Sequence, residues 1–407
     1  MRQDERLRPV LDTEPAKPPA LAGAVWALLV VNTLGSQGAQ TLVSIPQSVY
    51  QLITMGSLVI AFAIALVLNP RFTVQPNAFL LILTVLLVTS LVSTAPLEVG
   101  YGGLFRCGRL ALFIATLWLL SRWWDGTLAI VRRHIRVLGA VLVPVVLGLL
   151  VAPGLAMPDV YQGRLTGALW PFTPPQVGQY SAVVAGLTIV LWLARRTTGR
   201  NVLLVAAPAV ALLLLSYTRT ATLGLVVGIA VAGLSLVLTT VRARRFVVAT
   251  GIVASVVAVA LAPLVQLWFR RGQDDEDFSN LTGRQKVWDA LLAEPRTAYE
   301  QLFGSGLSNK TFGGLPIDSG WLAVFQEQGY LGVALVAAML MALLIAAVLR
   351  PPSAARACAL FLIAYCIVAS YTEVGLGDAS PYLLHLTVAA ALLSPAITTP
   401  TPPQEAR

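Results

Sequence analysis

Arginines that lack acidic neighbours are the residues of this sequence best suited to chemistry. Arg219 interrupts a long, almost continuously apolar stretch, and no acidic residue lies near it in the sequence. Arg164 lies in a glycine-containing segment, and Arg284 lies at the edge of the apolar face of a short predicted helix. The planar guanidinium group matches the oxygens of a phosphate. These three arginines therefore predict a shared anion site, to which we expect Arg106 and Lys310 to contribute.

Three carboxylates lie close to these arginines in the predicted topology. Asp318 precedes a helical stretch of residues 320–349, so it is either the N-cap of that helix or a proton acceptor at the site. Glu327 lies within the first turns of the stretch. It is either a substrate-binding residue or simply a polar residue at the membrane interface. Glu373 follows an apolar segment and is a candidate counter-ion for one of the arginines.

The composition requires that a membrane positions these groups. The chain is 57% hydrophobic and only 12% charged, and its mean hydropathy is +0.77, whereas a soluble domain is about 25% charged. Apolar runs near the length that crosses a bilayer recur along the chain. We expect twelve spans, at 20–36, 47–69, 77–95, 104–122, 136–153, 176–194, 201–217, 219–240, 246–267, 320–349, 355–371 and 379–394.

Residues 201–240 give the clearest structural expectation. As one helix they would be about 60 Å long, twice the thickness of the hydrocarbon core of a bilayer. The chain must therefore reverse within Ser216–Thr220, although this segment contains neither glycine nor proline. This places Arg219 in a tight turn between two spans.

The predicted fold class is an all-α polytopic membrane protein of about 12 transmembrane helices. One transmembrane domain covers residues 19–394, between disordered cytoplasmic tails at 1–18 and 395–407. A long extracytoplasmic loop, 268–318, carries short helices at about 283–293 and 296–303, and its acidic run 274–277 is expected to be a solvated surface.

The distribution of basic residues predicts the orientation. With the N-terminus inside, the inside segments hold 18 of the 28 lysines and arginines and the outside segments hold the other 10. This bias predicts a multi-pass protein of the plasma (inner) membrane with both termini in the cytoplasm. The net charge of +9 is divided among short clusters between spans, so no nucleic-acid partner is expected.

Other site chemistries find little support in the sequence. Cys107, Cys358 and Cys366 lie in or beside apolar runs, and their spacing matches no metal site. His134 is expected in a basic loop on the inside, and His385 is expected to be a packing residue of the last span. The sequence contains no nucleotide-binding loop, zinc motif or hydrolase elbow, so we expect neither a metal nor a cofactor.

The order of the polar motifs resembles the bacterial O-antigen ligase and Wzy-type polymerase family. The resemblance covers roughly residues 160–394. It is carried by Arg164-Leu165-Thr166-Gly167, Ser216-Tyr217-Thr218-Arg219, Gly283-Arg284 with Trp288, Gly304-Ser305-Gly306, Asp318-Ser319-Gly320-Trp321-Leu322 followed by Glu327-Gln328-Gly329-Tyr330-Leu331-Gly332, and Ser370-Tyr371-Thr372-Glu373. Ligases of that family have a histidine where this chain has Asp318, so lipid A as the acceptor is in doubt.

The resemblance implies a metal-independent glycosyltransferase. Its partners would be a polyprenyl-diphosphate-linked glycan donor, a glycan acceptor and membrane lipids. We expect Arg164, Arg219 and Arg284 to stabilise the diphosphate leaving group, with Arg106 and Lys310 secondary. Asp318 is the first candidate to accept the proton of the acceptor hydroxyl, and Glu327 or Glu373 is the second. The alternative is a secondary transporter or lipid-carrier flippase. Polarity concentrated at one end of the spans argues against that alternative, because transporters place polar groups near the midplane.

Overall fold

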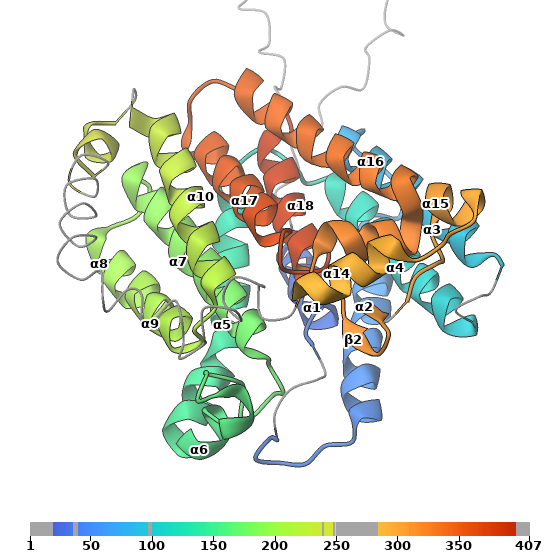
Figure 1. The fold of residues 1–407 in the computed structure, drawn as a ribbon. Helices are drawn as coiled ribbons and strands as arrows, with labels where there is room; N and C mark the ends of the chain where they lie inside the picture. The colour runs from blue at the N-terminus through green and yellow to red at the C-terminus, as the bar shows by residue number, and fades with distance from the viewer. Residues whose placement is uncertain are drawn as a thin grey trace, which may run out of the picture.

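The computed structural model describes residues 19–35, 40–96, 100–237, 240–246, 249, 284–308 and 310–395, which form a helical bundle (Figure 1). Its elements are α1 (Ala20–Asn32), α2 (Gln47–Leu68), α3 (Ala78–Thr94), α4 (Tyr101–Ser121), α5 (Ala129–Val151), α6 (Pro153–Ala156), η1 (Asp159–Tyr161), α7 (Pro174–Leu193), α8 (Gly199–Asn201), η2 (Val202–Ala206), α9 (Ala207–Leu215), α10 (Arg219–Val237), α14 (Arg284–Ala293), α15 (Ala298–Phe303), β1 (Thr311–Phe312), β2 (Leu315–Pro316), α16 (Gly320–Leu349), α17 (Ala354–Ala369) and α18 (Pro381–Leu393).

The helical, membrane-type architecture is confirmed. Six of the described helices, α2, α4, α5, α7, α10 and α16, are long and apolar enough to cross a membrane. Five apolar helices or helical runs are shorter and lie at five other positions where spans were expected. The count of twelve is not confirmed, and nearly all of the span expected at 246–267 lies outside the described residues. The predicted tails, apart from Pro395, also lie outside them.

The helices pack as two groups that share a border. One group contains α7, α9, α10, α17 and α18, with α5 at its edge, and the other contains α1, α2, α3, α4 and α16. Contacts of α16 with α17 and α18, and of α1 with α5, join the groups. Nearly all of α7 is buried, so this helix is the centre of its group.

Glycines set the closest approach between α7, α10 and α17. A Cβ atom on Gly186 of α7 would lie 2.0 Å from the ring of Phe361, and one on Gly228 of α10 would lie 2.7 Å from the same ring. The side chain of Phe361 therefore fills the space that both glycines leave. Small residues at such crossings allow helix backbones to approach in a medium that supplies no hydrophobic driving force between helices.

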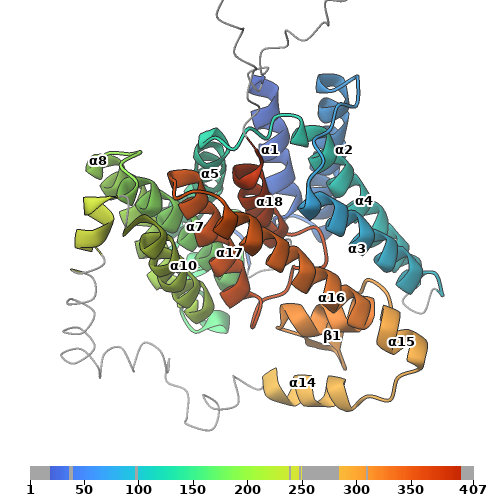
Figure 2. The same ribbon diagram turned by 90° about the horizontal axis from the view of Figure 1, so that it is seen from above.

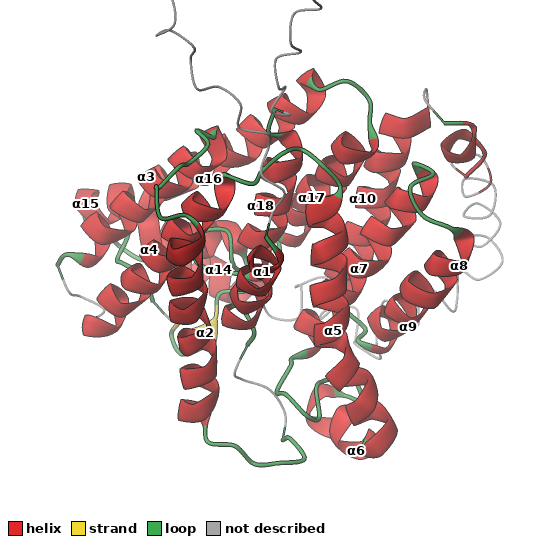
Figure 3. Cartoon of the chain, turned by 180° about the vertical axis from the view of Figure 1, so that it is seen from behind, coloured by secondary structure: helices red, strands yellow, loops and turns green. Residues whose placement is uncertain are grey.

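The polar segment before α16 folds onto one side of the bundle. There α14, α15 and the antiparallel β1–β2 hairpin lie together (Figures 2 and 3). The two short helices agree with the prediction, although the second begins at Ala298 after a capping box of Thr297 and Glu300. The hairpin was not predicted, and residues 268–283 of the expected loop lie outside the described part of the chain.

Candidate functional site

The reversal between α9 and α10 occurs where it was predicted. Helix α9 ends at Leu215 and α10 begins at Arg219. In place of a glycine, Tyr217 adopts a positive φ of 47°. The hydroxyl of Thr218 donates to the carbonyl of Pro174 at 3.0 Å, which fixes the turn to the start of α7. Arg219 is thereby held at the N-terminus of α10, where the helix dipole already disfavours a cation and favours an anion.

Arg164 lies against the same turn. Its Nε donates to the carbonyl of Ser216 at 3.0 Å, and the backbone N–H of Leu165 donates to the carbonyl of Leu215 at 2.9 Å. The loop before α7 and the turn before α10 therefore form one polar edge. Burial lowers the pKa of Arg164, whereas the nearby charge of Glu373 raises it.

Arg284, the first residue of α14, forms an ion pair with Asp318, which lies just before α16. Nε of Arg284 lies 3.2 Å from Oδ2 of Asp318, and the two side chains are 28% and 39% exposed. Asp318 is not the N-cap of α16, because the side chain of Ser319 takes that role by accepting from the N–H of Leu322. Asp318 therefore positions Arg284 at a site that remains accessible from outside.

Glu373 is the second carboxylate at this place. It follows α17 in a half-buried turn, and the charges of Arg284, Asp318 and Arg164 all act on it. Burial raises the pKa of Glu373 to about 7, although the two arginines oppose this shift. Among the described residues, no hydrogen bond or ion pair occupies its carboxylate. The carboxylate of Glu373 can therefore accept a proton near neutral pH, and it lies close to the positive charges of Arg284 and Arg164.

These contacts bring together five residues that the sequence singled out. We call Arg164, Arg219, Arg284, Asp318 and Glu373 the arginine cluster. The charges of Arg284 and Arg219 also act on Arg164, and that of Arg284 acts on Arg219. The guanidinium groups of three residues gather here, and their planar geometry suits a ligand with phosphate oxygens.

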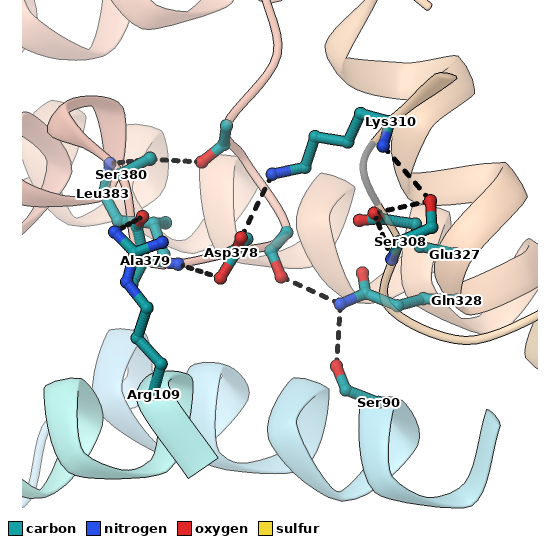
Figure 4. A network of polar contacts seen from close by, with 12 residues as sticks. Ser90, Arg109, Ser308, Lys310, Glu327, Gln328, Asp378, Ala379, Ser380 and Leu383 are labelled. Atoms are coloured by element: carbon teal, nitrogen blue, oxygen red, sulfur yellow. Dashed lines mark hydrogen bonds and ion pairs between the residues drawn. The ribbon is translucent and has the colours of Figure 1, made fainter. Parts of the chain in front are cut away.

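The other predicted site residues belong to a second group of contacts, shown in Figure 4. Nζ of Lys310 lies 3.1 Å from Oδ2 of Asp378, and the pair is nearly buried, with side chains 17% and 5% exposed. Burial favours the neutral forms, but their mutual attraction holds the pKa of Lys310 above its usual value and that of Asp378 below. The charges of Arg106 and Lys310 act on Glu327. We call Lys310, Asp378, Glu327 and Arg106 the lysine cluster.

A break in α16 positions Glu327 within the lysine cluster. Gly329 has φ +63° and ψ −164°, which interrupts the helix. The N–H groups of Ser305 and Gly306 donate to the carbonyls of Gln326 and Glu327 at 2.9 and 3.0 Å. They replace helical hydrogen bonds that the break removes, as buried irregular backbone in a membrane requires. The carboxylate of Glu327 in turn accepts from the N–H of Ser308 at 2.8 Å.

The lysine cluster is tightly bonded, in contrast with the arginine cluster. Gln328 donates to the hydroxyl of Ser90 and to the carbonyl of Gly377, each at 2.8 Å (Figure 4). Arg109 donates to the carbonyls of Asn32 at 3.0 Å and Ala379 at 3.3 Å. Asp378 and Gln328 had not been predicted as site residues. Their contacts indicate a clamp that holds the α14–α16 segment on the bundle.

The expectation that His134 lies in a loop is wrong. It lies fully buried in α5, and its Nε2 is 2.9 Å from Nδ1 of His385 in α18. The indole N–H of Trp26 donates to Nδ1 of His134 at 3.2 Å, and the amide of Gln179 lies 3.3 Å from Nε2 of His385. The hydropathy pattern predicted a helix from residue 136, whereas α5 begins at Ala129. Had the helix been predicted to begin there, His134 would have been placed within it.

No protein-family model matches the sequence, and comparison with curated proteins gives no match. Within the described residues, no group of three or more histidine, cysteine, aspartate or glutamate side chains could hold a metal ion. The chemistry therefore has to be argued from the two clusters themselves. The arginine cluster can bind a phosphate and accept a proton beside it.

Proposed function

We propose that this protein is an integral-membrane glycosyltransferase, a polymerase or ligase of the O-antigen type. It would move a glycan from a polyprenyl-diphosphate carrier to an acceptor glycan on the extracytoplasmic side. The observation that carries this proposal is the gathering of Arg164, Arg219 and Arg284, with the charges of Arg164 and Arg284 acting on Glu373. The chain's resemblance to that family, in the motifs that contain these residues, supplies the reaction type.

The three arginines would act on the leaving group. In the transfer, the acceptor hydroxyl attacks the anomeric carbon of the donor sugar, and the bond from that carbon to the diphosphate oxygen breaks. The bonding electrons leave with the diphosphate, whose charge grows in the transition state. Cations that are already in place stabilise such charge without reorganising, which makes this kind of stabilisation a large contribution to catalysis.

Glu373 is our choice for the group that takes the proton of the acceptor hydroxyl. Asp318 is the candidate favoured by the sequence alone, but it is engaged with Arg284 at 3.2 Å. The carboxylate of Glu373 has a pKa of about 7, raised by burial, and a general base is most effective when its pKa lies near the working pH. Asp318 would then orient Arg284, and both carboxylates would serve one reaction.

The lysine cluster would keep the site assembled. Lys310 and Glu327 bind other parts of the chain, so we assign them to positioning the α14–α16 segment over the bundle. Arg106 lies beside them on α4 and acts on Glu327 through its charge. The polyprenyl tail of the donor would lie between helices, and the glycan would lie under the α14–α15 segment.

A secondary transporter or lipid-carrier flippase is the second candidate. The buried contact of His134 with His385 favours it, because ionisable residues inside a membrane bundle often serve proton transfer. The broken helix at Gly329 favours it as well, since transporters bind substrate at such breaks. In this chain, however, the carbonyls at the break are occupied by Ser305 and Gly306 rather than facing a cavity.

The test is an assay of the purified protein with polyprenyl-diphosphate-linked oligosaccharide, without nucleotide sugar or added metal. We expect release of polyprenyl diphosphate. A longer glycan on the carrier would identify a polymerase, and a glycan on another acceptor would identify a ligase. We expect Arg219→Ala to lower the rate by about 10²–10³-fold, whereas Arg71→Ala, at an exposed position, leaves it unchanged. Absence of release with every native donor, while the protein moves the lipid across vesicles, would establish the alternative.

A further inference from the structure

A hollow that is partly open to the surroundings lies between the first turns of α1, the last turn of α4 and the first turns of α5. Its walls carry the rings of Trp26, Trp123 and Trp124. Helix α4 begins near the lysine cluster and is about 31 Å long at 21 residues. The hollow therefore lies at the opposite end of the bundle and is separate from both clusters.

Two opposite charges line the hollow without bonding to each other. Arg133 lies on α5 and Asp125 lies in the turn before it, and the charges of Arg136 and Asp125 both act on Arg133. Within the described residues, no hydrogen bond or ion pair engages the guanidinium of Arg133. Oδ1 of Asp125 accepts from the N–H of Thr127 at 2.9 Å, which leaves Oδ2 available.

The position of the hollow indicates what surrounds it. Arg133 is the fifth residue of α5, so it lies only about 6 Å along the helix from its start. In a helix that crosses a bilayer, this depth is that of the lipid headgroups. The half-buried Trp123 fits the same level, because tryptophan is enriched at the interface between membrane and water. The most abundant ligands at this place are phospholipid headgroups.

We propose that this hollow binds the headgroup of a phospholipid with a primary amine, a phosphoethanolamine group. Its phosphate would lie on Arg133, whose planar group suits phosphate oxygens. Its ammonium would lie on Asp125 and against the faces of the tryptophans, which attract cations. One ligand would thus satisfy both charges, which form no ion pair with each other among the described residues.

The same two residues discriminate against other headgroups. A phosphoglycerol group has a net negative charge and offers Asp125 no cation, so Asp125 would repel it. A phosphocholine group carries its charge on three methyl groups and cannot donate a hydrogen bond to the carboxylate. Preference for the primary amine therefore depends on Asp125, and affinity for any phosphate depends on Arg133.

Native mass spectrometry of the full-length protein in detergent can test the site. The protein is given an equimolar mixture of phosphatidylethanolamine, phosphatidylglycerol and phosphatidylcholine, and the retained adducts are counted. We expect the ethanolamine lipid to predominate. Arg133→Gln should reduce its retention by about tenfold, the size expected from the loss of a charge-assisted hydrogen bond. Arg132→Gln, the neighbouring exposed arginine, is the matched control and should retain it as the wild type does.

Asp125→Asn supplies the decisive comparison, because it removes discrimination and keeps the phosphate partner. We expect this variant to retain phosphatidylglycerol and phosphatidylethanolamine to similar extents. A wild-type protein that retains all three lipids equally, or an Asp125→Asn variant with unchanged preference, would overturn the proposal. Displacement of the lipid by millimolar inorganic phosphate would also overturn it, since the site would then recognise free phosphate alone.

Discussion

His134 and His385 bond ring to ring at 2.9 Å, although 251 residues separate them in the sequence. The direction of this bond follows from its neighbours. Trp26 donates to Nδ1 of His134, so the proton of a neutral His134 is on Nε2 and is donated to Nδ1 of His385. The amide nitrogen of Gln179 lies 3.3 Å from Nε2 of His385. Since Nε2 carries the remaining proton of His385, the amide has to be turned so that its oxygen accepts that proton.

The first prediction concerns this chain of contacts. His385→Leu leaves the donor of His134 without an acceptor in the core and should lower the free energy of unfolding by about 1–3 kcal/mol. The double variant His134→Leu/His385→Leu removes both partners, so its loss should be smaller than the sum of the single losses by at least about 0.5 kcal/mol. Thermal unfolding in detergent measures all three. Strictly additive losses would show that the two rings do not depend on each other.

The second prediction concerns the ion pair of Lys310 and Asp378. Because both side chains are nearly buried, Lys310→Met leaves an uncompensated carboxylate and should cost about 3–5 kcal/mol of stability. Adding Asp378→Leu removes that charge and should recover much of the loss. Denaturant unfolding of the two variants provides the comparison. If the double variant is less stable than Lys310→Met, the pair does not act as the clamp described above.

The reversal at Arg219 could be predicted from the sequence because it follows from length alone. One helix over 201–240 would be about twice as long as a bilayer is thick, and no other arrangement of these apolar residues fits. A shared site of Arg164, Arg219 and Arg284 was also predicted, because Arg219 interrupts an apolar stretch, Arg164 lies in a glycine-containing segment and Arg284 lies at the edge of the apolar face of a short helix. The cluster that they form with Glu373 follows that expectation.

The break at Gly329 could not be predicted from the sequence of α16. The segment from Gln326 to Gly329 continues a helical pattern, and the break is stable only because Ser305 and Gly306 donate to the exposed carbonyls. These partners belong to a different segment of the chain, so the sequence around Gly329 does not predict them. His134 was misplaced for a related reason. The arginines around it indicated a loop, but arginines can also lie on the first turns of a helix and extend to the membrane surface.

The third prediction tests the break directly. Gly329→Ala places a Cβ atom 2.4 Å from the backbone of Leu302 at a residue with φ +63°. The left-handed conformation alone costs about 1–2 kcal/mol for alanine, and displacement of α15 adds to it. We expect a clear loss of thermal stability. The control is Gly139→Ala in α5, where no atom lies within 4 Å of the added Cβ, and a gain of about 1 kcal/mol is expected there.

The comparison of Gly329→Ala with Gly139→Ala needs only melting temperatures and no activity assay. Equal, small changes in the melting temperatures of Gly329→Ala and Gly139→Ala would mean that α16 can continue through residue 329 at no cost. That result would contradict the role given to Ser305 and Gly306, whose N–H groups donate to the carbonyls that the break exposes.

The fourth prediction is a dependence of glycan transfer on pH. Burial raises the pKa of Glu373 from 4.5 to about 7, and only the ionised carboxylate can take the acceptor's proton. The transfer rate should therefore rise as the pH increases through about 7 and become constant above it. The same shift makes ionisation unfavourable to folding, so the part of the stability that depends on Glu373 decreases between pH 4.5 and about pH 7.

Glu373→Gln separates this assignment from the one that names Asp318 as the base. The amide keeps the shape of the side chain but cannot ionise, so transfer should decrease by about 10²–10⁴-fold and lose its rise near pH 7. Asp318→Asn should decrease transfer less and keep a rise with pH, because it loosens Arg284, whose pair with Asp318 is half-exposed. The rise should move to lower pH, since the charge of Asp318 raises the pKa of Glu373. The reverse pattern, with a flat pH profile in Asp318→Asn and a normal one in Glu373→Gln, would transfer the role of base to Asp318.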